Sequence, residues 1–216
     1  MHRLALFDLD NTLVDRGAAF TACVTEFCAA AGYDPQIEAW MLTELADRAV
    51  PDDFDRLRRD FSLTEPADQL WQAYVDAMAA AVFCRPAVLT GLADLRSDGW
   101  TVGIVTNGAS DIQRAKLRAT GIAALVDGVA VSGDIEVRKP DRQLFELAAK
   151  QCGADLTDGG WLVGDNPAAD IGGAQQAGLR SIWLRGHPWP VGLAAPDRTV
   201  DNVLEAIDIL LTQPRR

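Results

Sequence analysis

The amino-acid sequence predicts an α/β fold: a Rossmann-like core built on a parallel sheet, with an all-helical domain inserted into it. Residues 4–7 form a continuous apolar run, as expected for a strand buried on both faces. Residues 17–83 show only helical periodicity. From Pro86 onward, short apolar runs alternate with helical patterns, which is typical of a parallel sheet with right-handed crossover helices.

The inserted segment is expected to hold about four helices and no strand. Apolar residues recur at helical spacing in residues 20–28 and 70–78. Pro35, Pro51 and Pro66 stand where helices are expected to begin, because proline suits the first helical turn.

The elements expected after the insertion alternate regularly. The helices cover residues 90–98, 110–121, 141–151, 168–177 and 201–211. The strands cover residues 101–106, 129–131, 161–163 and 181–184. Because the helical segment interrupts the core after its first strand, we divide the chain into an α/β catalytic core (1–15 and 86–216) and a helical cap (16–85), joined by hinges at both junctions.

Length, charge and cysteine content narrow the class of protein. The chain has 216 residues and a net charge of −11, which argues against nucleic acid or an anionic membrane as a partner, since both need a basic surface. Its four cysteines form no CxxC pair and are expected to be reduced. We recognise no signal peptide and no apolar run of transmembrane length, so we expect a cytoplasmic protein, either a monomer or a homodimer. The two histidines, His2 and His187, show no metal-ligand pattern, and we assign them no role.

Acidic residues come directly after the first strand, in the sequence DLDNTLVD of residues 8–15. A carboxylate such as Asp8 can attack phosphorus and form an aspartyl-phosphate, which divides one difficult step into two. If residues 8–10 remain extended, the side chain of Asp10 lies on the same side, where it can protonate the leaving alcohol and later deprotonate the attacking water. Thr12 can donate a hydrogen bond to the phosphate. An Asp-x-Asp-x-Thr sequence at the end of a buried strand therefore favours phosphoryl transfer over a simple turn or helix cap.

Residues expected to bind the phosphate follow later strands. Thr106 ends the second core strand, and Asn107 and Gly108 follow it before a helix begins. A hydroxyl group together with loop amides makes a cradle for an anion. Lys139 is expected to reach into the same crevice and to neutralise the nucleophile and the phosphate oxygens. Since ligands of open parallel sheets bind beyond the carboxyl ends of the strands, these residues should converge with Asp8.

A metal site is expected at the same edge of the sheet. Asp165 follows the strand of residues 161–163 and a glycine. Together with the Asp8 carboxylate and the main-chain carbonyl of Asp10, it would form an oxygen site that suits Mg²⁺. We expect Asp170 to orient metal-bound waters or the nearby lysine, and Asn166 to bind a metal-bound water.

The order of these motifs resembles that of the haloacid dehalogenase (HAD) superfamily over nearly the whole chain. Matching residues resemble its nucleophile and acid/base, its phosphate-binding pair and its acidic metal motif, in that order: Asp8, Asp10, Thr106, Lys139, Asp165 and Asp170. The insertion resembles the helical cap of the haloacid dehalogenase and phosphoglycolate phosphatase branch. The resemblance implies a HAD-like fold and a Mg²⁺-dependent phosphatase that hydrolyses a small phosphorylated metabolite through an aspartyl-phosphate intermediate.

Four alternatives use similar residues. A 2-haloacid dehalogenase of the same fold would need neither the metal site nor an acid/base such as Asp10, so both residues Asp10 and Asp165 disfavour it. A sugar-phosphate mutase would keep the same residues and differ only in its cap. A response-regulator receiver places its phosphorylated aspartate after a later strand. A non-catalytic phosphate-binding scaffold would usually have lost part of the catalytic set, and here the set is complete.

Overall fold

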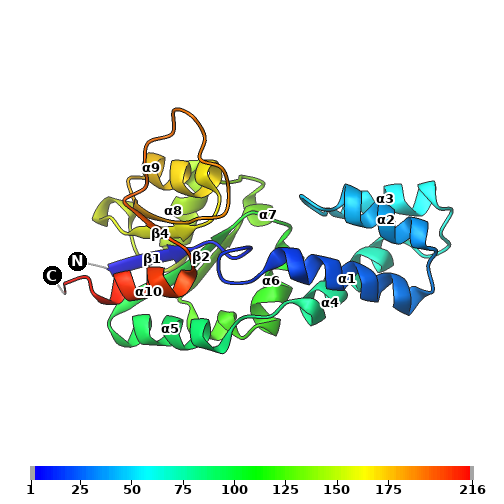
Figure 1. Cartoon of the computed structure of the whole chain (residues 1–216), viewed down its shortest axis with the longest axis horizontal. Coiled ribbons are helices and arrows are strands. Elements are labelled where there is room, and N and C mark those ends of the chain that lie inside the picture. Colours follow the sequence, from blue (N-terminus) through cyan, green and yellow to red (C-terminus); the bar gives the residue numbers. More distant parts are fainter. Residues whose placement is uncertain (1–2, 215–216) are drawn as a thin grey trace.

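The computed structural model describes residues 3–214, in which six parallel strands form one sheet of order β3-β2-β1-β4-β5-β6 (Figure 1). The strands are β1 (Arg3–Phe7), β2 (Trp100–Thr106), β3 (Gly128–Val131), β4 (Trp161–Gly164), β5 (Arg180–Leu184) and β6 (Arg198–Val200). The predicted α/β fold class with a parallel core sheet is confirmed. Each strand predicted from an apolar run begins and ends within about one residue of its expected bounds, which is the usual uncertainty of element ends.

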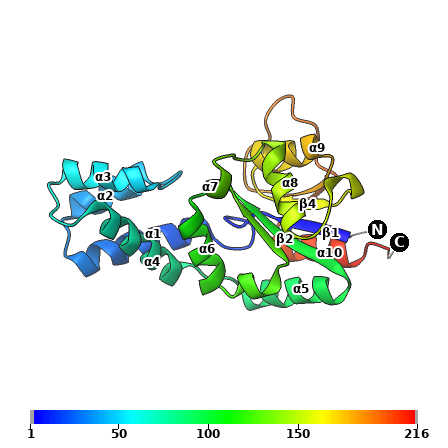
Figure 2. The same ribbon diagram turned by 180° about the vertical axis from the view of Figure 1, so that it is seen from behind.

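Alternate residues of the central strand β1 pack into two different cores. Leu4 and Leu6 belong to the cluster under α8 (Arg142–Gln151) and α9 (Gly173–Ala177). Ala5 and Phe7 belong to a second cluster, together with residues of α5 (Pro86–Ser97) and α10 (Val203–Leu211). Figures 1 and 2 show these helix pairs on opposite faces of the sheet. Burial on both faces explains why the strand reads as a continuous apolar run.

The inserted segment consists of helices that lie beside the sheet, past the carboxyl end of β1 (Figures 1 and 2). They are α1 (Arg16–Ala31), α2 (Pro35–Glu44), α3 (Pro51–Asp60) and α4 (Ala67–Ala81). Helices α2 and α3 begin at proline, and Pro66 is the N-cap residue of α4, as the sequence predicts. Helix α4 packs against α6 (Ser110–Ala119), the helix that follows β2. The insertion therefore contacts the core at the edge where the strands end.

Several elements differ from the sequence prediction. Strand β6 was not predicted, because Arg198 and Thr199 are exposed and the segment has no apolar run. Helix α5 starts at Pro86, earlier than the predicted residue 90. Instead of one α-helix over 168–177, a π-helical segment, η3 (Pro167–Gly172), precedes α9. Short helices that were not predicted are η1 (Ile122–Leu125), α7 (Ser132–Ile135) and η2 (Leu156–Asp158).

Taken one at a time, the helices within residues 3–214 fall short of the length and apolar character of a membrane span. Helices α4 and α5 reach that length only as a pair, and they are bent by 85° to each other. Residues 1, 2, 215 and 216 of the predicted core, including His2, lie outside the described residues.

Candidate active site

Asp8 is held at the carboxyl end of β1 by the turn that follows it. Its amide donates a hydrogen bond of 2.9 Å to the Val163 carbonyl of the neighbouring strand β4. The carbonyl of Leu9 then accepts from the amides of Leu13 and Val14, which reverses the chain direction. The Asp8 side chain is buried, although it carries a carboxyl group. A buried carboxylate requires charge compensation nearby.

Lys139 supplies that compensation. Its Nζ lies 2.6 Å from Asp8 Oδ1 and 2.7 Å from Asp170 Oδ1, and it donates to the Val105 carbonyl at 2.8 Å. The Asn107 side chain accepts from the Lys139 amide at 2.9 Å and donates to its carbonyl at 3.2 Å. The three N–H groups of the ammonium are thus matched by three oxygens. Lys139 therefore bridges two carboxylates at the end of the sheet.

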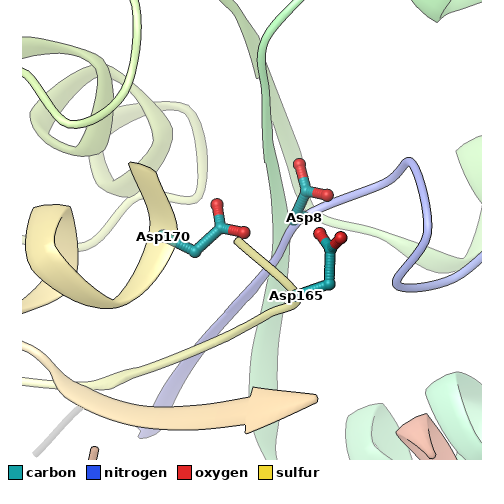
Figure 3. A group of neighbouring side chains, drawn as sticks. All are labelled: Asp8, Asp165 and Asp170. Carbon is teal, nitrogen blue, oxygen red and sulfur yellow. The ribbon is translucent and has the colours of Figure 1, made fainter. Parts of the chain in front are cut away.

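Asp8, Asp165 and Asp170 form a cluster of carboxylates, whose oxygens come within 4.8 Å of one another (Figure 3). The Asp170 side chain points from η3 toward Asp8 and Asp165 (Figure 3). Its Oδ2 accepts a hydrogen bond of 2.9 Å from the main-chain amide of Asn166. A side chain at Gly164 would collide with the Asp170 carboxyl group, so this position needs glycine. The segment after β4 therefore brings both of its acids to the end of β1.

Burial and like charges shift the pKa values of this cluster. Burial, helped by the nearby Asp170 and opposed by Lys139, raises the pKa of Asp8 to about 8. Burial and the Asp170 charge also raise the pKa of Asp165, while His187 opposes this. Burial lowers the pKa of Lys139, but the charges of Asp170 and Asp8 outweigh it and leave that pKa above its usual value. When ionised, the three carboxylates carry more negative charge than Lys139 offsets. In the absence of another cation, protonation of one carboxyl group reduces this excess.

The donor set fits a hard divalent cation such as Mg²⁺. Every side-chain donor of the cluster is a carboxylate oxygen, the type of ligand that Mg²⁺ prefers. The pKa values of Asp8 and Asp165 are raised by burial and, to a smaller extent, by the Asp170 charge, and a cation there would favour the ionised carboxylates. Both oxygens of Asp170 are already engaged, by Lys139 and by the Asn166 amide. Asp8 and Asp165 are thus the side chains best suited to hold the ion, with Asp170 in the supporting position expected from the sequence.

Asp10 lies in a separate group of polar side chains. Its two carboxylate oxygens are both 2.9 Å from Nζ of Lys116 on α6. Gln113, on the same helix, donates from Nε2 to Asp10 Oδ2 at 3.1 Å and to Thr106 Oγ1 at 2.7 Å. Because Thr106 Oγ1 accepts from this amide, its own hydroxyl proton is free to be donated to a phosphate oxygen.

The remaining predicted phosphate ligands are only partly available. The Gly108 amide donates to Ser132 Oγ at 2.9 Å, so it is occupied within the protein. The Asn107 side chain is engaged with the backbone of Lys139, as described above. Thr12 Oγ1 is buried and has no hydrogen-bond partner among residues 3–214, which leaves it available to donate. In this structure, the hydroxyl group of Thr106 is thus free to donate to a phosphate, whereas the side chain of Asn107 and the amide of Gly108 are engaged within the protein.

Asn166 also differs from its expected role. Its Oδ1 accepts from the Ala169 amide at 2.9 Å, which caps the first turn after β4. Only the amide nitrogen of this side chain, a donor, remains for a contact with a metal-bound water. The preference of asparagine for helix N-caps explains the difference.

Sequence reasoning missed three residues of this site. Lys116 and Gln113 are almost fully buried although they are polar residues of a surface helix. Their spacing of three places them on one helix face, which was the available signal. His187, which was assigned no role, lies with Nε2 3.1 Å from Asp165 Oδ2. It belongs to a loop after β5, and no local pattern points to this contact.

A small polar cavity of about 60 Å³ lies between the inserted helices and the core. The insertion contributes Arg16, Arg48 and Tyr74 to its wall. The core contributes Arg138 and Asp10, together with the donors of α6 described above. Cationic side chains thus gather locally although the whole chain has a net charge of −11. An anionic ligand would be attracted here by nearby charges and not by the overall field.

Comparison with known proteins identifies the family. A family model described as haloacid dehalogenase-like hydrolase matches residues 5–184. The pyrimidine 5′-nucleotidase YjjG of Escherichia coli is 33% identical over 144 residues, which make up 66% of this chain and 63% of that enzyme, so the chain spans less than two thirds of this relative. A plasmid-encoded phosphoglycolate phosphatase of Cupriavidus necator is 30% identical over 219 residues, covering 97% of this chain and 93% of that enzyme.

The fold is also similar to that of a solved HAD phosphatase. A crystal structure of a HAD phosphatase from Thermococcus onnurineus superimposes with a TM-score of 0.69 and 23% identity, over 97% of this chain and 98% of that one. At this identity the similarity establishes the fold. The family match and the full-length similarity to the Cupriavidus necator enzyme go further: the chain belongs to the haloacid dehalogenase-like hydrolase family.

Proposed function

We propose that this protein is a Mg²⁺-dependent phosphatase that hydrolyses a small phosphorylated metabolite through an aspartyl-phosphate on Asp8. The observation that carries the proposal is the position of Asp8. It lies at the carboxyl end of the central strand, paired with Lys139 at 2.6 Å and clustered with Asp165, while Asp10 follows two residues later. Relatives named as phosphatases and nucleotidases support the same reaction class.

In the first step, an oxygen of Asp8 forms a bond to phosphorus while the bond from phosphorus to the leaving alcohol breaks. Asp10 donates its proton to the departing oxygen. Thr106 and Thr12 donate hydrogen bonds to the phosphate oxygens, and Lys139 holds the Asp8 carboxylate in place. In the second step, a water oxygen attacks phosphorus, the bond to Asp8 breaks, and Asp10 takes the proton of the water.

Asp8, Asp165 and the main-chain carbonyl of Asp10 would hold the Mg²⁺ ion. When bound, the ion supplies positive charge that offsets the charge of the transferring phosphoryl group. Asp170 contributes indirectly, because it orients Lys139 at 2.7 Å.

We infer that helices α1–α4, within residues 16–85, act as a cap over this site, and that residues 1–15 and 86–216 form the catalytic core. The cavity beside Asp10 has walls from both parts, which supports this division. Closure of the cap would exclude bulk water from the reaction.

The test is phosphate release from p-nitrophenyl phosphate and from a panel of phosphorylated metabolites, with Mg²⁺ and with chelator. We expect Mg²⁺-dependent release that disappears in Asp8→Asn, and the order of the panel would identify the substrate class. Chloride release from 2-haloacids without Mg²⁺ would indicate a dehalogenase. Isomerisation of a sugar phosphate without net phosphate release would indicate a mutase, and inactivity toward all of these by folded protein would indicate a binding scaffold.

A further inference from the structure

One buried cation of the site is unexplained by the reaction as described. Lys116 is only 3% exposed, and its ammonium contacts both carboxylate oxygens of Asp10 at 2.9 Å. Gln113, one helical turn earlier on α6, is 1% exposed and contacts Asp10 Oδ2 at 3.1 Å. A lysine is seldom buried unless it is paired, so the burial of the Lys116–Asp10 pair requires an explanation.

We propose that Lys116 and Gln113 are positioning residues for Asp10, which hold its carboxyl group beside Thr106, where the leaving oxygen of the phosphate ester departs. The proposal rests on the function proposed above, since it assigns these two residues a task in that reaction. They act through Asp10 and need not touch the substrate.

The contacts fix the Asp10 carboxyl group more tightly than a single ion pair would. Lys116 reaches both oxygens, and Gln113 reaches one of them from a second direction. The same Gln113 amide is 2.7 Å from Thr106 Oγ1. One side chain therefore joins the acid/base to the residue expected to bind the phosphate. A proton-transferring group must be held within hydrogen-bond reach of its target, so this link sets a distance on which the chemistry depends.

The loop after β2 is shaped to let Gln113 make these contacts. A Cβ atom at position 108 would lie 2.7 Å from Gln113 Cγ and 2.9 Å from its Cδ. Any residue larger than glycine would force Gln113 to move. Gly108, in the TNG sequence of residues 106–108, thus leaves room for Gln113 in addition to its place in the turn. Its amide is bound to Ser132.

The Asp10–Lys116 pair also lies in the wall of the cavity that is expected to receive the leaving group. Asp10, Gln113 and Lys116 line the cavity between cap and core, together with Tyr74 and Met78 of α4. Thr106, which is expected to bind the phosphate, contacts Gln113 of the cavity wall, so the alcohol part of the substrate is expected to extend into this cavity. Asp10 therefore lines the cavity that would receive the leaving group and is linked to Thr106 through Gln113.

In the step concerned, the bond from phosphorus to the ester oxygen breaks, and that oxygen receives the proton of the Asp10 carboxyl group. The carboxylate that remains is then paired with Lys116. Proton donation matters most for a strongly basic leaving oxygen and least for a good leaving group such as p-nitrophenolate. A positioning role therefore predicts an effect that depends on the leaving group.

The experiment measures kcat/KM of the full chain with Mg²⁺ on p-nitrophenyl, phenyl and alkyl phosphates. For Lys116→Met we expect a loss of about threefold or less on p-nitrophenyl phosphate and a loss of about 10- to 100-fold on the alkyl ester. Lys116→Arg, which keeps the positive charge and the donors, should recover much of the alkyl activity. Arg114→Met is the matched control, because Arg114 lies on the same helix and pairs with Asp134 at 2.8 Å on the surface; it should leave all three substrates unchanged.

A double-mutant cycle tests whether Lys116 acts through Asp10. In an Asp10→Asn background, Lys116→Met should cause no further loss on any substrate. If Lys116→Met does not fold, the uncharged variant Gln113→Met is measured in the same two ways. Equal losses across the leaving-group series, or an undiminished loss in the Asp10→Asn background, would overturn the proposal. If wild-type protein releases no phosphate from any ester, the proposed function itself fails, which is a different result.

Discussion

The site contains two buried lysines, each paired with one carboxylate of the Asp8-x-Asp10 motif. They define the Asp8 half, which contains Lys139, Asp165 and Asp170, and the Asp10 half, which contains Lys116 and Gln113. Lys139 lies between Asp8 and Asp170 and also donates to a backbone carbonyl, so its three donors are used and its surroundings are closed to solvent. Lys116 has Asp10 as its carboxylate partner, and the Asp10 side chain is 17% exposed toward the cavity.

The difference between these pairs suggests different tasks. The Asp8 half is a rigid cluster that carries more negative charge than its lysine offsets, which suits a metal ion and a nucleophile held in one place. The Asp10 half opens to the cavity beside the inserted helices, which suits a group that exchanges protons with a leaving alcohol and with water.

The largest effect is expected from the nucleophile. Asp8→Asn keeps the shape of the side chain and removes the attacking carboxylate, so kcat should fall on the order of 10⁴-fold or more. Asp10→Asn should cost about 10²- to 10⁴-fold, with the smaller losses on p-nitrophenyl phosphate, because it removes proton transfer and leaves the nucleophile intact. Steady-state kinetics of both variants check this order. A smaller loss for Asp8→Asn than for Asp10→Asn on p-nitrophenyl phosphate would contradict the assignment of roles.

Metal removal should act on the carboxylates of the Asp8 half and not on the pair of the Asp10 side chain with Lys116. Chelator should abolish turnover, and Mg²⁺ at about 100 times its dissociation constant should stabilise the folded protein by about 2.7 kcal/mol. Calorimetric titration and thermal unfolding with and without Mg²⁺ measure both effects. Asp165→Asn should lose this stabilisation, whereas Lys116→Met should retain it. Stabilisation by Mg²⁺ that survives Asp165→Asn would place the ion elsewhere.

The two lysines should differ in their contribution to folding. Lys139→Met leaves two buried carboxylates without their cation, and breaking such a pair costs about 3–5 kcal/mol of unfolding free energy. Lys116→Met leaves one carboxylate that still has the Gln113 amide and some contact with solvent, and should cost about 1.5–3 kcal/mol. Urea unfolding in chelator measures both, with the surface variant Arg114→Met as control. A larger cost for Lys116→Met would reverse the comparison.

The Asp8 half should also make the stability of the metal-free protein depend on pH. The pKa of Asp8 is raised from 3.8 to about 8, so between these values the folded protein holds a proton that the unfolded chain has released. This contribution to stability is present below about pH 4 and is lost as the pH rises through about 8. Urea unfolding of wild type and Asp8→Asn in chelator at pH 5 and pH 8 isolates it. The wild type should lose more stability than the variant over this interval; an equal or smaller loss would contradict the raised pKa.

The smallest effect is expected at His187. Its contact with Asp165 is half-exposed, so the ion pair is weak even when the imidazole is protonated. His187→Gln should change Mg²⁺ affinity by about fivefold at most, equivalent to about 1 kcal/mol. A calorimetric Mg²⁺ titration measures this value. A change of 100-fold would instead make His187 a principal partner of the metal site.

The Asp8 half was predictable from sequence and the Asp10 half only in part. Asp8 and Asp165 directly follow apolar strands, and Thr106 is the last residue of one. Parallel topology brings the ends of such strands together. Lys116 and Gln113 lie on a helix, and their burial depends on the packing of the inserted helix α4 against α6, which no local pattern records. The contact of His187 with Asp165 likewise depends on how a loop after β5 folds back.

Backbone details were also beyond the sequence prediction. The Gly108 amide was expected to face a phosphate, but Ser132 from the segment after β3 binds it. Asn166 was expected near the metal, but the turn after β4 uses its side-chain oxygen as a cap. In both cases a polar group had several possible partners, and the tertiary structure selected one of them.

The most direct measurement is identification of the phosphorylated residue. Enzyme mixed with p-nitrophenyl phosphate and Mg²⁺ is quenched in acid within the first turnovers, reduced with borohydride to convert an acyl phosphate into an alcohol, digested and analysed by mass spectrometry. We expect Asp8 to be converted to homoserine in wild type and no conversion at position 8 in Asp8→Asn. Conversion at another aspartate, such as Asp10 or Asp165, would show that Asp8 is not the nucleophile.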